Sequence, residues 1–304
     1  MMPVENGYCK RGKVIMRESL TKESLYERYA VGGESIREIS RATGYAESTI
    51  SKHMKVHEIE QNPHGHYIKR NYIDSSGFLD VSDDWHAYWI GFLAADGCIY
   101  EDGKNSIRVQ LHLQQSDADH MKNFRDGVGS KSAIRFGGKG GSSAAILCLY
   151  DPPLATALAR WGIVPNKTLQ LSWPTDFPEH LLSAYIRGYF DGDGTVYQRH
   201  RKNGGSNWTE TICRFIGGSQ SFLERLKTEL EERGIETLCI YRNQQSNAFF
   251  LPLSGRRENL LVFSEFLYTG STVCLERKKE IFNDLERYHQ AHPRVKSWLR
   301  YKAS

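Results

Sequence analysis

Hydrophobic and polar positions alternate most regularly over residues 107–114 of this chain. Every second residue is apolar, and the residues between them are long hydrogen-bonding side chains with no acid among them. Strict alternation with a period of two predicts a β-strand whose apolar face packs against a core. The polar face consists of Arg108, Gln110, His112 and Gln114.

Two stretches with helical spacing of apolar residues, 89–97 and 186–194, share one layout. Both end in Asp-Gly, and their acids Asp96 and Asp193 are 97 positions apart, which indicates two halves of a duplicated domain. The closing glycine predicts a helix that ends in the left-handed backbone conformation. Small residues four positions apart let helix backbones approach closely, so we expect the two helices to pack side by side. These small residues are Gly91, Ala95, Gly188 and Gly192.

A similar order of elements is predicted after each of these helices. In the first half, a helix at 85–96 precedes a strand at 107–114, a helix at 117–128, strands at 134–136 and 145–150, and a helix at 152–161. In the second half, strands at 195–199 and 211–217 flank a basic loop at 199–202; a helix at 219–233, strands at 238–242 and 248–253, and helices at 256–267 and 275–288 follow. This order predicts an α+β fold in which an αββαββα unit is duplicated with pseudo-two-fold symmetry.

The segment 21–58 predicts a small all-α domain of three short helices. Leu25, Tyr26 and Tyr29 form an apolar face on the first helix. Ser35 and Glu38 form a capping box that opens the second. Its inward residues are Ile36, Ile39 and Ala42, and those of the third helix, 47–56, are Ile50 and Met54.

These three helices resemble the helix-turn-helix of resolvase-type recombinases and many regulators. The resemblance implies a DNA-binding surface on the third helix, with Ser48, Ser51 and Lys52 facing outward. A three-helix packing module without a role in DNA binding is the alternative. The complete predicted organisation is a flexible N-terminus at 1–20, this domain at 21–58, a linker at 59–82, the first repeat at 83–174, and the second repeat with a C-terminal helix at 175–304.

Composition narrows the class of protein without naming a function. Of the 304 residues, 39% are hydrophobic and 25% charged, which is typical of a soluble globular protein. No secretory signal or membrane span is visible, and the six dispersed cysteines indicate reduced thiols in a cytoplasmic protein and make zinc improbable. The net charge of +4 permits nucleic-acid binding but does not require it.

The two acids stand where a helix disfavours them. Each helix C-terminus carries partial negative charge, so an uncompensated carboxylate there costs up to about 1 kcal/mol. If the helices pair, Asp96 and Asp193 come together, and a divalent metal is the simplest compensation. The alternative is a pair of plain helix-ending Asp-Gly turns.

For the strand 107–114 two interpretations also stay open. Arg and Gln read guanine and adenine edges in DNA, but a solvated sheet face is equally consistent with the pattern.

Together, the two motifs, the repeated elements and the closing Leu-Glu-Arg-Lys at 275–278 resemble the LAGLIDADG homing endonucleases, over roughly residues 83–290. The resemblance implies a monomer that makes a Mg²⁺-dependent double-strand break in a long asymmetric target in double-stranded DNA, with Mn²⁺ able to substitute. It implies that Asp96 and Asp193 bind the metal, with the backbone carbonyls of Ala95 and Gly192 as further ligands. Lys278 matches a basic catalytic residue of the family, and Lys167 is a looser match.

The resemblance also implies a saddle-shaped sheet that reads DNA in each half. The candidates in the first half are the polar residues of strand 107–114; those in the second half are Arg199, Arg201, Arg214 and Arg242. Such an enzyme is expected at the nucleoid or in a phage-infected cell. The first motif departs from the family at Ala94, where the second has Asp191; this is not a metal-binding position.

Three alternatives use the same fold. An intein carrying this domain needs a splicing nucleophile and a closing His-Asn pair, which we do not expect here. A non-cleaving transcriptional regulator and an RNA maturase remain open. The presence of both acids favours cleavage over regulation.

Overall fold

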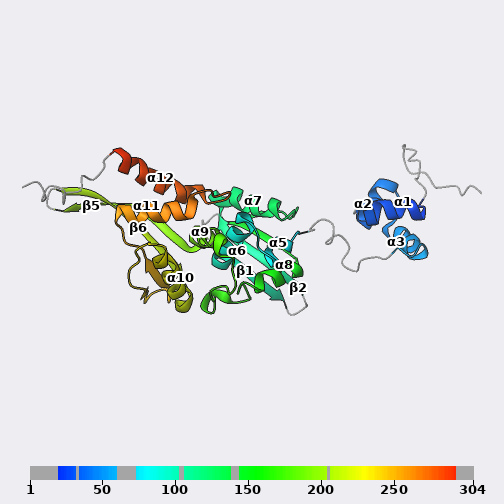
Figure 1. Cartoon of the computed structure of the whole chain (residues 1–304). Helices are drawn as coiled ribbons and strands as arrows, with labels where there is room; N and C mark the ends of the chain where they lie inside the picture. The colour runs from blue at the N-terminus through cyan, green and yellow to red at the C-terminus, as the bar shows by residue number, and fades with distance from the viewer. Residues whose placement is uncertain are drawn as a thin grey trace, which may run out of the picture. The chain divides into compact units, whose positions relative to one another are not determined.

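The computed structural model describes residues 20–31, 34–59, 73–102, 106–137, 144–203 and 206–291 (Figure 1). The chain forms two compact units, residues 1–72 and residues 73–304. Residues 1–19 of the predicted flexible N-terminus and residues 60–72 of the predicted linker lie outside the described residues. Leu20, the last residue of that predicted N-terminus, packs in the core of the N-terminal unit.

The N-terminal unit has the three predicted helices, with one addition. They are α1 (Lys22–Tyr26), which continues into the π-helix η1 (Glu27–Val31), α2 (Ile36–Thr43) and α3 (Glu47–Val56). The capping box of Ser35 and Glu38 is present, and α2 ends at Gly44 in the left-handed conformation with φ 73°. The fully buried core consists of Leu25, Ile39, Ile50 and Met54.

Two inward positions predicted in this unit are wrong. Tyr26 is exposed, because the helix changes to π geometry immediately after it. Ala42 is exposed as well, and Thr43 is buried in its place. Thr43 lies one turn after Ile39, and its hydroxyl donates to the Ile39 carbonyl at 2.6 Å, so the polar group is satisfied inside the unit.

The larger unit confirms the predicted fold class: it is α+β, with a helix-strand-strand-helix-strand-strand-helix order in each half. The first half contains α5 (Ser76–Leu79), α6 (Asp84–Asp96), β1 (Gly97–Asp102), β2 (Ser106–Gln114), η2 (Gln115–Asp117), α7 (Ala118–Gly127), β3 (Arg135–Gly137), β4 (Ala144–Leu149) and α8 (Pro152–Ala159). The second half contains η3 (Lys167–Leu169), η4 (Glu179–Leu181), α9 (Leu182–Asp193), β5 (Gly194–Asn203), β6 (Ser206–Gly217), α10 (Gln220–Glu232), β7 (Tyr241–Arg242), β8 (Phe249–Pro252), α11 (Arg257–Tyr268) and α12 (Glu276–Ala291).

Each half has its own antiparallel sheet. Among the described residues, the strand orders are β1-β2-β4-β3 and β5-β6-β8-β7, so the two sheets have the same topology. The alternation predicted for 107–114 is confirmed, since Val109, Leu111 and Leu113 are buried. The predicted basic loop at 199–202 is wrong: these residues lie within β5, because the hairpin is longer than the alternation of apolar residues indicates.

Helices α6 and α9 lie side by side at the centre of the larger unit (Figure 1). A Cβ atom added to Gly91 would lie 1.9 Å from the carbonyl oxygen of Tyr185, and one added to Gly188 would lie 1.9 Å from that of Tyr88. Neither position accepts a side chain. The prediction that small residues bring the helices together is therefore confirmed.

The glycines that end the two motifs correct the sequence-based reasoning. Gly97 has φ −74° and ψ 150°, and Gly194 has φ −79° and ψ 154°, so both are extended and begin a strand. The reason for glycine is space: a Cβ on Gly97 would lie 2.6 Å from the Leu93 carbonyl oxygen, and one on Gly194 would lie 2.3 Å from that of Phe190.

The predicted linker 59–82 extends too far at both ends. Ile59 is buried in the N-terminal unit. Ile73, Phe78 and Val81 are buried in the core of the larger unit. The turn residues in this segment predict a linker. The apolar residues at its two ends instead pack in the hydrophobic cores of the two units.

Candidate metal centre and nucleic-acid interface

Asp96 and Asp193 end the two central helices, and the structure brings them together. A Cβ placed on Gly192 would lie 3.4 Å from Oδ2 of Asp96, so this carboxylate lies against the end of the other half's helix. Burial raises the pKa of Asp193 to about 6, the charge of Asp96 raises it further, and Lys167 and Lys278 oppose the shift. Burial also raises the pKa of Asp96. Burial therefore disfavours the charged form of both carboxyl groups, in spite of the two lysines nearby.

A buried lysine accompanies each acid. The Lys167 ammonium donates to the carbonyl oxygen of Ala95 at 2.9 Å. The Lys278 ammonium donates to the carbonyl oxygens of Phe190 and Asp191 at 2.6 and 2.7 Å, and also contacts those of Gly192 and Gly194. Burial lowers the pKa of both lysines, that of Lys278 to about 8. Each ammonium offsets the partial negative charge of a helix C-terminus.

The donor set fits a hard divalent cation. Carboxylate and carbonyl oxygens suit Mg²⁺ or Mn²⁺, and a carbonyl that accepts one lysine hydrogen bond keeps a second lone pair. Within the described residues, no cluster of three or more His, Cys, Asp or Glu side chains could hold a metal. A cation held here would have two carboxylates from the chain and would take its other ligands from carbonyl oxygens, water or phosphate, as is usual for Mg²⁺.

Asp191 is a buried carboxylate beside this site that the sequence analysis did not use. It accepts hydrogen bonds from the Leu275 backbone N–H at 2.6 Å, the Tyr88 hydroxyl at 2.9 Å and the Tyr268 hydroxyl at 3.4 Å. Burial raises its pKa to about 6. Leu275 immediately precedes α12, so Asp191 fixes the start of the helix that carries Lys278. The one available signal was the difference between Asp191 and Ala94.

Arg187 joins the halves at the other end of the helix pair. It is 1% exposed and donates to both carboxylate oxygens of Asp84 at 2.7 Å. It also donates to the carbonyl oxygens of Val273 and Leu267 at 2.9 and 2.8 Å. Sequence reasoning missed this residue too, because its partners lie far away along the chain.

The four polar residues of β2 share the face of the first sheet that is turned away from the core. Side chains opposite one another in adjacent strands share a face, and Arg108 is opposite Tyr100. The Arg108 guanidinium lies 4.2 Å from the centroid of the Tyr100 ring and donates to the Tyr150 hydroxyl at 3.3 Å. His112 and Gln114 are exposed, and Gln110 is partly buried.

In the second sheet, the register brings three of the four predicted arginines together. Arg199 and Arg214 share one face with Arg201, since each occupies a position of the same parity in the β5–β6 pairing. Arg214 lies over the Phe250 ring at 4.7 Å. Arg242 is opposite Phe249, which is on the other face of the sheet, so the structure does not bring Arg242 into this group.

The third predicted surface is in the N-terminal unit. Ser48 and Lys52 are exposed on α3, and Ser51 is partly buried. Ser48 and Lys52 are therefore accessible on α3, while Ser51 lies closer to the buried Met54.

Comparisons with known proteins come from a family model and from solved structures. The model described as "LAGLIDADG-like domain" matches residues 180–265, which include Asp193 but not Asp96 or Lys278. The LAGLIDADG meganuclease I-AabMI, in a crystal structure bound to uncleaved DNA, has a TM-score of 0.49 and 10% identity, covering 69% of this chain and 91% of that one. A structure of mesophilic variants of the homing endonuclease I-DmoI has a TM-score of 0.42 and 18% identity, covering 64% and 92%. No curated protein matches the chain by sequence.

In the described residues, no helix is both long and apolar enough to cross a membrane.

Proposed function

We propose that this protein is a LAGLIDADG-type endonuclease that uses a divalent metal, expected to be Mg²⁺, to cut both strands of a long asymmetric DNA site as a monomer. One observation carries the proposal. Two partly buried aspartates, Asp96 and Asp193, meet at the ends of two closely packed helices, and a buried lysine accompanies each one. The family match to residues 180–265 supports the same conclusion for the second half.

The proposed chemistry assigns a task to each group. Asp96 and Asp193 would hold the metal, and the carbonyl oxygens of Ala95 and Gly192 would be further ligands. A bound metal would supply a deprotonated water and neutralise the charge on the leaving oxygen. Lys278 and Lys167 place an ammonium beside the scissile phosphate and stabilise the extra charge of the pentavalent phosphorane. With a pKa of about 8, Lys278 is mostly protonated at neutral pH.

The two sheets are proposed to read one half-site each. Arg108, Gln110, His112 and Gln114 serve the first half-site, and Arg199, Arg201 and Arg214 serve the second. In both sheets an arginine lies over an aromatic ring, which limits the conformations of its side chain. Fixed arginines suit bidentate contacts to guanine in the major groove. We leave Arg242 out of this set because it lies on the opposite face.

The N-terminal unit is proposed to act as a second DNA-binding module through Ser48, Ser51 and Lys52. A tethered second module raises affinity without adding to the chemistry. Deleting residues 1–60 is then expected to weaken binding while the cut position stays the same. If the protein without residues 1–60 bound its target DNA with the same affinity as the full chain, this unit would be a structural element.

The cleavage proposal is tested on DNA with randomised inserts. A plasmid library is incubated with the protein and Mg²⁺, and the newly formed ends are captured and sequenced. The controls are EDTA and the Asp96→Asn/Asp193→Asn double variant, which should give no ends. Sequence-specific DNA binding with no cut in Mg²⁺ or Mn²⁺ would favour a transcriptional regulator. Binding to RNA alone would favour a maturase.

A further inference from the structure

The two hairpins that follow the motif helices differ in length. Both begin at equivalent glycines: Gly97 is paired with Leu111, and Gly194 is paired with Phe215. From there β1 has six residues and β5 has ten, and both are paired along their whole length. At roughly 3.3 Å per residue, four additional residues extend the second hairpin by about 13 Å.

A cluster of charge lies where the additional length begins. It is on the front face, which we define as the face shared by Arg199, Arg201 and Arg214; Arg199 is paired with Glu210 at the last position that β1 also has, and Arg201 lies in the additional length. Oε2 of Glu210 accepts hydrogen bonds from Arg199 at 3.0 Å and from Arg201 at 3.1 Å. The side chains of Arg199 and Arg201 are 41% and 47% exposed. Glu210 therefore holds two guanidinium groups in place, and one positive charge is left over.

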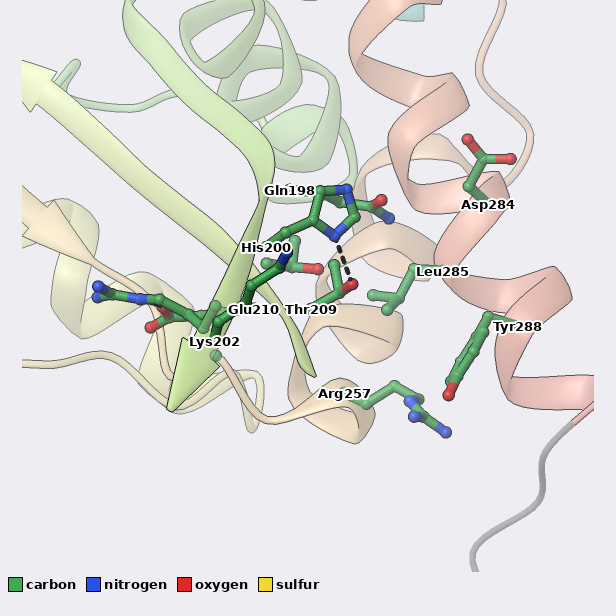
Figure 2. A pocket seen from close by; sticks show the side chains of 12 residues that line it. Gln198, His200, Lys202, Thr209, Glu210, Arg257, Asp284, Leu285 and Tyr288 are labelled. Atoms are coloured by element: carbon green, nitrogen blue, oxygen red, sulfur yellow. Dashed lines mark hydrogen bonds and ion pairs between the residues drawn. The ribbon is translucent and has the colours of Figure 1, made fainter. Parts of the chain in front are cut away.

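The back face of the same hairpin is turned toward the protein. Gln198, His200 and Lys202 line a cavity of about 800 Å³ whose other wall is formed by residues of α11 and α12, among them Leu285 and Tyr288 (Figure 2). The His200 Nδ1 atom lies 3.0 Å from the Thr209 hydroxyl across the hairpin. Arg201 and Glu210 also border this cavity. By strand register, however, the arginine side chains belong to the face opposite to that of His200, so helix α12 faces the hairpin from behind.

The extension also reaches past the rest of its sheet. Strand β8 pairs with β6 only over residues 214–217, so residues 206–213 of β6 are paired with β5 alone among the described strands, apart from a single hydrogen bond to the Cys213 carbonyl. A two-stranded ribbon can enter the major groove of B-DNA.

We infer that the second half reads a longer half-site than the first, by about 4 base pairs at roughly 3.4 Å per base pair. This inference rests on the proposed DNA-binding function. Arg199 and Arg201 make the outermost contacts, and Glu210 is a positioning residue that fixes both of them. The target is therefore asymmetric in length as well as in sequence.

The test is a binding selection from random double-stranded DNA of about 40 base pairs, performed on the full chain without divalent metal. Gln110→Ala and Arg214→Ala supply internal reference points, because these residues precede the equivalent positions Leu111 and Phe215. Each of these two variants should lose preference at one base pair, which marks the same point in its half-site. We expect the selected sequence preference to continue from the Arg214 base pair toward the outer end for about 4 base pairs more than it does from the Gln110 base pair.

Two neighbouring residues provide a matched pair of variants. Arg201→Ala is expected to abolish preference only at the outer end of the longer half-site, and Glu210→Gln is expected to weaken it there. Lys202→Ala removes the same charge from the back face and should leave the preferences unchanged. The inference would be overturned if the two half-sites had equal length, or if Arg201→Ala weakened binding equally at all base pairs of the target. Neither result would contradict the endonuclease proposal. If no sequence is selected at all, both fail.

Discussion

The two halves of the larger unit present the same functional groups but support them differently. Lys278 projects from a 16-residue helix, and its ammonium contacts four carbonyl oxygens of the second half. Lys167 lies in a three-residue 3₁₀ turn that follows Asn166 at φ 58°, and its ammonium donates to the Ala95 carbonyl. The duplication thus preserves an acid and a lysine in each half but not their surroundings.

Asp191 accounts for part of this difference. It accepts the N–H of Leu275 before α12, whereas Ala94, the corresponding residue of the first half, has no side-chain acceptor. Arg187, also from the second half, connects the halves through Asp84. The second half therefore contributes both buried charges, and their partners come from both halves.

The acids are where the halves should behave alike. Asp96→Asn and Asp193→Asn should each abolish double-strand cleavage, a loss well beyond the roughly 100-fold typical of removing a residue that hydrogen-bonds to a metal ligand. DNA affinity should change little, because phosphate contacts elsewhere supply most of the binding. Cleavage is measured on the selected target and affinity by fluorescence anisotropy. Full cutting by either variant would contradict the metal assignment.

The lysines are where the halves should diverge. Lys278→Met should slow cleavage by about 10²- to 10³-fold, the range for losing one donor to a developing charge. It should also lower the thermal stability more than Lys167→Met, because more helix-end carbonyls lose their donor. Strand-specific nicking and thermal unfolding check both expectations. Equal stability losses for the two variants would show that the different supports have no energetic consequence.

Two buried groups should give the halves opposite pH dependence. Burial lowers the pKa of His120, in the first half, to about 4, so its neutral form stabilises the fold above pH 6.5 and this contribution is lost as pH falls toward 4. The full effect is about 3 kcal/mol. Burial raises the pKa of Asp191, in the second half, to about 6, so ionisation weakens the fold as pH rises from 4 through 6.

Thermal unfolding between pH 4.5 and 7 tests this opposition. The Tm difference between wild type and His120→Gln should grow with pH, and the difference between wild type and Asp191→Asn should shrink. Parallel curves for wild type and both variants would contradict the assignment of these pKa values.

The smallest effects are expected on the reading faces. Arg108→Ala and Arg214→Ala should each cost about 1–3 kcal/mol at one or two base pairs, and in opposite half-sites. A cleavage profile over single-base variants of the target measures this. A uniform loss across the site would assign these arginines to phosphate contacts.

Much of the fold was predictable because its signals are local. Alternation over 107–114, the capping box at Ser35 and the helices that end at Asp96 and Asp193 all depend on residues a few positions apart. The close packing of α6 and α9 also followed from sequence, since glycines at matching positions leave few other arrangements. The resemblance of the two motifs then led to the proposal that the two acids and Lys278 form the site.

Other features depended on partners that no local pattern reveals. Asp191 meets Leu275 and Tyr88, and Glu210 meets two arginines, only after the chain has folded. Strand register decided the face on which Arg242 lies, because a shift of one residue exchanges the two faces. Position 97 requires glycine because a side chain there would contact Leu93, not because of its φ angle.

By itself, then, the sequence determined the helices, the core alternation and the chemical groups of the site, since these arise from short-range periodicity. The tertiary structure alone decided which buried charges meet and how far each hairpin reaches, since both depend on contacts between residues distant in the chain.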